Sequence, residues 1–244
     1  MTRFAILAVP RTGSNLLCTL LNSHPEILCH HELFNPQGIF LALSQRDRSF
    51  DLPSLHERDV APVAFLEKIW QAGREHPCVG FKWTRGQSTT VLEHVVQERE
   101  IIKIVLRRRN RVKTYVSAEI AQATQQWEAY SQQELTQPRP RVTVENAQLR
   151  RHICENERFY ADLRTALERT QQSAINLCYE NLFSRDEQRR LLQLLGVSGV
   201  DQPLTAASVK QNPTSLGDVI ANFAELAADL AGSDLEAELY DSEM

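Results

Sequence analysis

The stretch AVPRTGSNLL, Ala8 to Leu17, decides the fold of this chain. Before it, the residues RFAILAV (3–9) form a short apolar run that Pro10 ends, as expected for a buried strand of a parallel sheet. After it, leucines recur at helical spacing, at Leu16, Leu17, Leu20 and Leu21. The predicted helix ends at His24 and Pro25. The stretch is therefore a tight strand–turn–helix junction around one glycine, Gly13.

The same alternation continues along the chain. Apolar runs of strand length cover 27–29, 78–83, 101–106 and 173–179. Helical patterns cover 37–75 in weaker form, and then 88–98, 110–130, 144–170, 185–195 and 215–231. Alternating strands and helices predict an α/β fold, a P-loop-like three-layer arrangement with a mainly parallel central sheet flanked by helices. We expect a single domain over residues 1–244, ending in a solvated acidic tail over 234–243.

Composition excludes several classes of protein. The 27 Lys and Arg residues against 31 Asp and Glu residues give a net charge of −4, which argues against general nucleic-acid binding. No apolar run approaches the roughly 20 residues of a transmembrane helix, and the first run is too short for a secretory signal. The cysteines form no C-x-x-C pair, so we expect no zinc site and no disulfide framework, but reduced thiols of a cytoplasmic protein: Cys18, Cys29, Cys78, Cys154 and Cys178.

The glycine turn has the features of an anion site. The first N–H groups of a helix have no partner within the helix, and with the helix dipole they attract phosphate-like groups. Arg11 adds a positive charge, Thr12 and Ser14 add hydroxyl donors, and Gly13 allows the tight turn. The Walker A pattern G-x-x-x-x-G-K-[ST] is absent, which weighs against an ATPase or GTPase. The alternative interpretation is a capped turn with no ligand.

A second basic segment follows about 100 residues later. The run IIKIVL ends in RRRN, and Ser117 comes eight residues after Arg109. Asn110 and Ser117 are seven residues apart, so they share one face of the predicted helix. Arginine grips phosphate strongly because its planar fork offers parallel donors. Arg109 and Ser117 could therefore hold a second anion, and the alternative is a basic surface patch.

Three segments carry a resemblance to a known family. AVPRTGSNLL, VLRRRNRVKTYVS and CYENLF resemble the PAPS-dependent sulfotransferase superfamily, and within it the bacterial carbohydrate enzymes of the trehalose sulfotransferase type. The resemblance implies a transferase that moves a sulfuryl group from PAPS (3′-phosphoadenosine 5′-phosphosulfate) to a hydroxyl of a small-molecule, carbohydrate or glycolipid acceptor, leaving PAP. No metal is expected, because backbone donors and Arg11 already offset the charge and the sequence shows no cluster of metal ligands. Since relatives are often dimers, a homodimer is one expected state.

The resemblance also implies roles for individual residues. Arg11, Thr12, Gly13, Ser14 and Asn15 would hold the 5′-phosphosulfate. Arg109 and Ser117 would hold the 3′-phosphate, Tyr179 would lie near the adenine, and Lys210 would be a further 3′-phosphate ligand. The chain departs from many eukaryotic relatives in having Arg11 where they have lysine, and in lacking an evident glycine-rich C-terminal segment.

The expected base comes from the second strand. That strand ends in HHELFNP, which brings His30, His31 and Glu32 to the carboxyl edge of the sheet, where ligands gather. The related bacterial family places a glutamate here as the proposed base, so Glu32 is the first candidate and His31 the second. A carboxylate in this role would benefit from a raised pKa, which partial burial of Glu32 could provide. Arg11 would stabilise charge on the leaving oxygen. The alternative for Glu32 is an ordinary ion pair.

Two other functions remain open from the sequence. One is a P-loop nucleotide kinase-like enzyme, against which the missing lysine argues. The other is a PAP-binding protein without catalysis. The acceptor cannot be read from the sequence, but Lys82 and Trp83 end the middle strand near the same edge, and Asn156 either lines the acceptor cleft or bonds a neighbouring helix.

Overall fold

The computed structural model describes residues 1–47, 53–135, 140–209, 211 and 215–241. Its five-stranded sheet has the order β2-β3-β1-β4-β5, and every adjacent pair is parallel. The strands are β1 (Thr2–Ala8), β2 (Ile27–His30), β3 (Cys78–Thr84), β4 (Ile101–Arg107) and β5 (Ile175–Cys178). Since all strands run in one direction, the loops that follow them meet at a single edge of the sheet. The α/β class and the parallel sheet predicted from the sequence are confirmed.

The helices connect these strands and follow the periodic segments of the sequence. They are α1 (Ser14–Asn22), α2 (Leu55–Val60), α3 (Pro62–Ala72), α4 (Thr89–Gln97), α5 (Arg111–Thr124), α6 (Asn146–Arg169), α7 (Arg185–Leu195), α8 (Phe223–Leu230) and α9 (Glu236–Tyr240). Short 3-10 turns are η1 (Leu43–Gln45), η2 (Gln132–Glu134), η3 (Tyr179–Asn181) and η4 (Leu216–Asp218).

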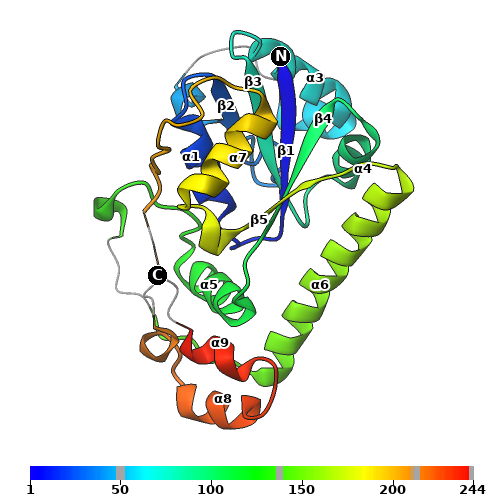
Figure 1. Cartoon of the computed structure of the whole chain (residues 1–244). Coiled ribbons are helices and arrows are strands. Elements are labelled where there is room, and N and C mark those ends of the chain that lie inside the picture. Colours follow the sequence, from blue (N-terminus) through cyan, green and yellow to red (C-terminus); the bar gives the residue numbers. More distant parts are fainter. Residues whose placement is uncertain (48–52, 136–139, 210, 212–214, 242–244) are drawn as a thin grey trace.

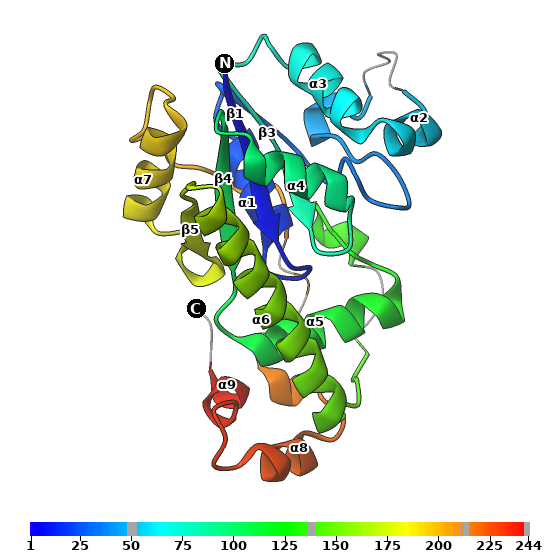
Figure 2. The same ribbon diagram turned by 90° about the vertical axis from the view of Figure 1, so that its right-hand side faces the viewer.

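The sheet lies between two layers of helices (Figures 1 and 2). Alternate residues of β1 point to opposite faces, as the two-residue period of a strand requires. Phe4 and Ile6 pack with the leucines of α1 and α7, while Ala5 and Leu7 pack with side chains of α3, α4 and α6. All four β1 side chains are fully buried. The three-layer arrangement therefore follows from a central strand that is apolar on both faces.

A third apolar cluster lies beyond the carboxyl edge of the sheet, in the lower part of Figure 1. There α5, the first half of α6, α8 and α9 pack together. Glu238 of α9 accepts hydrogen bonds from the backbone N–H groups of Arg111 (2.5 Å) and Val112 (3.2 Å), and it also pairs with the Arg111 guanidinium. The expectation of a solvated tail was thus wrong for 236–240, because a carboxylate there caps the first turn of α5.

Two predicted helices have different bounds in the structure. The helix expected over 110–130 ends at Thr124, where Gln125 adopts a left-handed φ of 54°, so Trp127 is exposed instead of lying on the helical stripe. The helix expected over 215–231 is divided into η4 and α8. In both places a local backbone turn overrides the periodic pattern.

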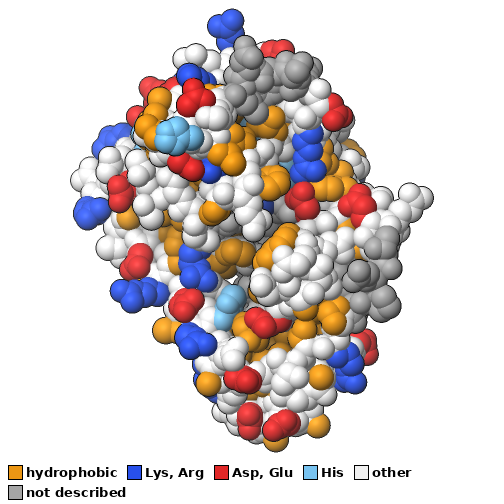
Figure 3. Space-filling view, turned by 180° about the vertical axis from the view of Figure 1, so that it is seen from behind, with side chains coloured by type: hydrophobic (Ala, Val, Ile, Leu, Met, Phe, Trp, Pro, Cys, Tyr) orange, Lys and Arg blue, Asp and Glu red, His pale blue; other side chains and the backbone are white. Residues whose placement is uncertain are grey.

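Both signs of charge occur on the surface of the described residues. Figure 3 shows acidic and basic side chains interspersed on one face, with neither charge forming a continuous patch among the coloured residues. Within the described residues, no helix is long and apolar enough to cross a membrane.

Candidate functional site

The loop between β1 and α1 lies at the carboxyl edge, at the central strand of the sheet. Gly13 is the N-cap of α1 and has a left-handed φ of 85°, which glycine adopts without steric cost. In the described chain no side chain caps this helix, so its first N–H groups face outward as expected for an anion site. The buried Thr12 donates its hydroxyl to the Val9 carbonyl (2.9 Å) and so fixes the loop. Ser14 is buried as the first residue of α1.

Arg11 joins this loop to two distant segments. Its φ of 68° is left-handed, a conformation that costs a non-glycine residue roughly 1–2 kcal/mol. Its guanidinium donates from Nε to Ser117 Oγ (3.0 Å), from Nη1 to the Trp127 carbonyl (2.5 Å) and from Nη2 to Gln211 Oε1 (3.1 Å). The first loop and α5, the helix that follows β4, are therefore in direct contact.

Of the residues expected at the nucleotide end, Tyr179 lies directly on the loop, whereas Arg109 contacts the segment after β5. A Cβ atom on Gly13 would lie only 2.2 Å from Cδ2 of Tyr179, so this ring packs directly on the glycine. The Arg108 guanidinium covers the same ring at 4.6 Å from its centroid. Arg109 has an exposed side chain, and its backbone N–H donates to Glu180 Oε1 (2.8 Å). Lys210 lies outside the described residues.

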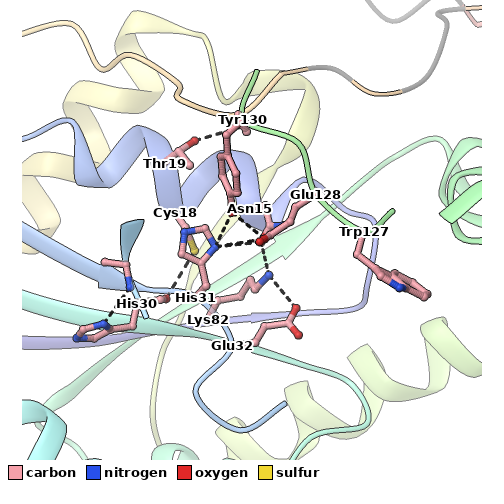
Figure 4. A network of polar contacts seen from close by, with 12 residues as sticks. Asn15, Cys18, Thr19, His30, His31, Glu32, Lys82, Trp127, Glu128 and Tyr130 are labelled. Atoms are coloured by element: carbon pink, nitrogen blue, oxygen red, sulfur yellow. Dashed lines mark hydrogen bonds and ion pairs between the residues drawn. The ribbon is translucent and has the colours of Figure 1, made fainter. Parts of the chain in front are cut away.

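Glu32 lies in a polar network that reaches the first loop (Figure 4). Its Oε1 is 2.8 Å from Nζ of Lys82, and Lys82 also donates to Oδ1 of Asn15. The Lys82 side chain is only 4% exposed, and that of Glu32 is 22% exposed. Asn35 donates to the other carboxylate oxygen of Glu32 at 2.5 Å. Glu32, Lys82 and Asn15 thus form a continuous chain of contacts from the end of the second strand to the first turn of α1, next to the first loop.

The charge state of Glu32 follows from these contacts. Burial raises the pKa of the Glu32 carboxyl, but Lys82, Asn35 and Gln87 together lower the pKa below the usual 4.5. The raised pKa that burial could provide is therefore not found, because the ammonium beside the carboxylate, together with the hydrogen bonds, outweighs burial. Glu32 is ionised at neutral pH and available as a proton acceptor.

His31 is poorly placed for the role of base. Its side chain is only 1% exposed, and burial, with Lys82 and Arg46 nearby, lowers its pKa to about 2. Nδ1 lies 3.3 Å from Oδ1 of Asn15, which can only accept, so Nδ1 carries the proton. The other ring nitrogen, Nε2, is buried and has no partner among the described residues.

Several residues of the network could not be found from the sequence. Glu128 accepts hydrogen bonds from Asn15 (3.1 Å), Arg46 (2.9 Å) and Tyr130 (2.7 Å), and its carboxylate lies 4.0 Å from His31. Arg46, Glu128 and Tyr130 come from irregular segments that carry no motif. The sequence partly indicated Lys82, because a charged residue inside an apolar strand needs a polar partner when it is buried.

We expect the two buried histidines to make folding sensitive to acid. The pKa values of His30 (about 4) and His31 (about 2) lie below the usual 6.5, mainly through burial. Below pH 6.5 the unfolded chain therefore binds protons that the folded chain excludes, and stability falls as the pH decreases. Each histidine contributes a slope of about 1.4 kcal/mol per pH unit. Urea unfolding between pH 7 and 5 measures this slope.

A variant separates the histidines from other titrating groups. His31→Gln should remove about one histidine's share of the slope, whereas the exposed His56→Gln serves as the control. An unchanged slope in His31→Gln would show that His31 is accessible to protons in the folded state.

Comparisons with known proteins extend over almost the whole chain. No family model matches it. The nodulation protein H of Rhizobium tropici is 26% identical over 233 residues, covering 94% of this chain and 89% of that protein. Nodulation protein H of Rhizobium meliloti (strain 1021) is also 26% identical, covering 93% and 91%. A sulfotransferase crystal structure from Alicyclobacillus acidocaldarius covers 98% of this chain and 96% of its own, with 17% identity and a TM-score of 0.46.

Proposed function

We propose that this chain is a PAPS-dependent sulfotransferase that moves a sulfuryl group to a hydroxyl of a small-molecule, carbohydrate or glycolipid acceptor, with Glu32 as the general base. The observation that carries the proposal is the 3.0 Å contact between Nε of Arg11 and Oγ of Ser117. It places side by side the two segments that would hold opposite ends of the donor. The Glu32 network begins at the same loop, through Asn15 and Lys82.

The residues present fit an anionic nucleotide. The N-terminus of α1 has outward-facing N–H donors, and Gly13 leaves the backbone free of a Cβ at its closest approach to Tyr179. Arg11, Arg108, Arg109 and Lys82 supply positive charge around this loop. PAPS would supply a sulfuryl group already bonded to a phosphate leaving group. We propose that Arg11 to Asn15 hold the phosphosulfate and that Arg109, Ser117, Tyr179 and Lys210 hold the nucleotide.

The chain's own residues can then carry the transfer. The α1 N–H groups and Arg11 offset negative charge on the leaving oxygen, as preorganised donors do in other transferases. The acceptor oxygen bonds to sulfur, the sulfur–oxygen bond to the nucleotide breaks, and the hydroxyl proton goes to Glu32. Lys82 keeps Glu32 ionised and lies between it and the loop. The bond formed, the bond broken and the proton transferred are thus all accounted for.

PAP should stabilise the folded protein. Binding at about 100 times Kd adds roughly 2.7 kcal/mol, which for a chain of this size raises Tm by about 5–10 °C. Arg109→Ala should remove most of that increase, because an arginine–phosphate contact is charge-assisted. Differential scanning fluorimetry with and without PAP measures both effects.

Arg99→Ala is a matched control for this experiment. Arg99 and Arg109 are both exposed arginines, and they flank opposite ends of β4. Arg99→Ala should retain the full PAP shift. A wild-type protein whose Tm does not respond to PAP would contradict the donor assignment, and an equal shift in Arg109→Ala would remove Arg109 from the site.

A further inference from the structure

Four polar side-chain atoms on two segments beside the site have no hydrogen-bond partner among the described residues, although each is buried. Two are on the turn between β3 and α4, namely Nε of Arg85 and Oε1 of Gln87. The other two are on α6, namely Nε2 of His152 and Oδ1 of Asn156. Gln87 is only 7% exposed and Asn156 only 8%. Buried polar atoms are almost always paired, so a cluster of unpaired ones requires an explanation.

The turn and the helix face each other. Arg85 forms an ion pair with Glu155 at 3.4 Å, and the Trp83 ring stacks on Phe159 with 5.8 Å between centroids. Arg85 also acts on His152, where burial and this positive charge lower the pKa of the imidazole. Asn156 is one helical turn from His152 and adjacent to Glu155, so it lies on the part of α6 that borders the turn.

Both segments also border the reacting groups. On the turn, Gln87 is one of the residues whose hydrogen bonding lowers the pKa of Glu32. On α6, the Tyr160 hydroxyl accepts the backbone N–H of Val9 (3.2 Å), directly before the anion loop. Asn156 precedes Tyr160 by one turn, which places the two residues about 6 Å apart along the same face of the helix. Gln87 therefore contacts Glu32 itself, and Asn156 lies one helical turn from the side chain that contacts the start of the first loop.

We propose that Gln87 and Asn156 form an acceptor subsite, with Arg85 and His152 at its outer end. The inference rests on the proposed function and adds to it the groups that the acceptor must carry. An amide offers an acceptor oxygen and an NH₂ donor, so hydroxyl groups, which both donate and accept, satisfy it best. The acceptor thus carries at least one further hydroxyl next to the one that is sulfated. A ligand of this kind satisfies the oxygen atoms that the fold leaves unpaired.

Stability distinguishes this role from a structural one. The buried amide oxygen of Asn156 is unpaired, so an apolar side chain of similar shape removes an uncompensated polar atom from the interior and should cost little stability or add some. Asn156→Leu should therefore keep or raise Tm, whereas a structural hydrogen bond at this position would make Tm fall by several degrees. A clear fall in Tm would overturn the proposal.

Ligand binding provides the second measurement, which needs no turnover. In ¹⁵N spectra of the protein with PAP, glucose should shift the side-chain NH₂ signals of Gln87 and Asn156, whereas cyclohexanol, a ring with a single hydroxyl, should not. The exposed Asn176 is the control amide. Asn156→Leu should weaken glucose binding, followed at Gln87, at least tenfold. Glucose that shifts neither signal, or binding that survives Asn156→Leu unchanged, would overturn the subsite.

The proposed function is tested separately in the same samples. PAP binding and sulfate transfer report on the donor site, and the two amide signals report on the subsite. If glucose shifts the two amide signals but PAP does not raise Tm, the subsite is supported and the sulfotransferase assignment is wrong.

Discussion

Glu32→Gln is expected to lower kcat for sulfate transfer by a factor of about 10²–10⁴, the usual contribution of a general base. The amide has the same shape as the carboxylate but cannot accept the hydroxyl proton. Since the donor is assigned to other residues, the PAP-dependent increase in Tm should survive. Sulfate transfer from labelled PAPS, followed with PAP binding in the same preparation, measures the two effects.

The substitution also affects stability, because it leaves Lys82 without its carboxylate partner. Lys82 is almost completely buried, so removing that partner lowers Tm. Glu32→Asp keeps the charge and withdraws the carboxylate by one methylene group, so it should keep more stability and still lose most of the rate. The exposed Glu93→Gln is the control. Near wild-type turnover in a folded Glu32→Gln protein would mean that another group accepts the proton.

The pH dependence of turnover provides an independent check on the same residue. The folded pKa of Glu32 lies below 4.5, so the carboxylate stays charged until the pH falls through that lowered value. The ion pair with Lys82 likewise stabilises the fold above the pKa of the unfolded carboxyl, and that stability disappears as the pH falls through the folded pKa. Any acid limb of turnover due to Glu32 should therefore lie below pH 4.5. A limb near pH 6.5 would point to a histidine.

The parallel sheet could be predicted because its strands depend on local signals. Each strand is a continuous apolar run, and every predicted strand overlaps an observed one. The alternation with helices then leaves few arrangements besides a sheet with helices on both faces. The ends of α5 and the C-terminal region were harder to predict, because they depend on a left-handed turn at Gln125 and on the contact between Glu238 and the start of α5.

Only part of the candidate site could be predicted from the sequence. Glycine, arginine and small hydroxyl residues at a strand–helix junction indicate an anion site from a few consecutive residues. The first loop could therefore be predicted as a candidate site. Ser117 was recognised by its spacing from Arg109, yet in the structure its hydroxyl contacts Arg11. The partners Arg46, Glu128 and Tyr130 meet the loop only through tertiary packing, which no local pattern encodes. The lowered pKa of Glu32 also depends on Lys82, about 50 residues further along the chain.

Gly13→Ala is expected to abolish PAP binding, with a loss of affinity of at least about 100-fold. The methyl group would lie 2.2 Å from Cδ2 of Tyr179, closer than any van der Waals contact, and both atoms belong to segments assigned to the donor. Either the Tyr179 ring or the loop must move, and movement of the loop displaces the N–H groups of α1. The left-handed φ of 85° adds about 1–2 kcal/mol of backbone strain. Calorimetric titration with PAP measures the affinity, and Tm measures the strain.

Backbone strain and steric clash can be separated because the chain contains a second glycine of the same conformation. Gly232 has a φ of 72°, and a Cβ there would meet nothing within 4 Å, so Gly232→Ala carries the strain without the clash. It should lower Tm modestly and leave PAP affinity unchanged. Combining Gly13→Ala with Tyr179→Ser removes the ring that the new methyl group meets, and should recover part of the stability lost by Gly13→Ala. If Gly13→Ala binds PAP like the wild type, the loop does not approach the donor closely, and the anion site must be placed elsewhere on the sheet edge.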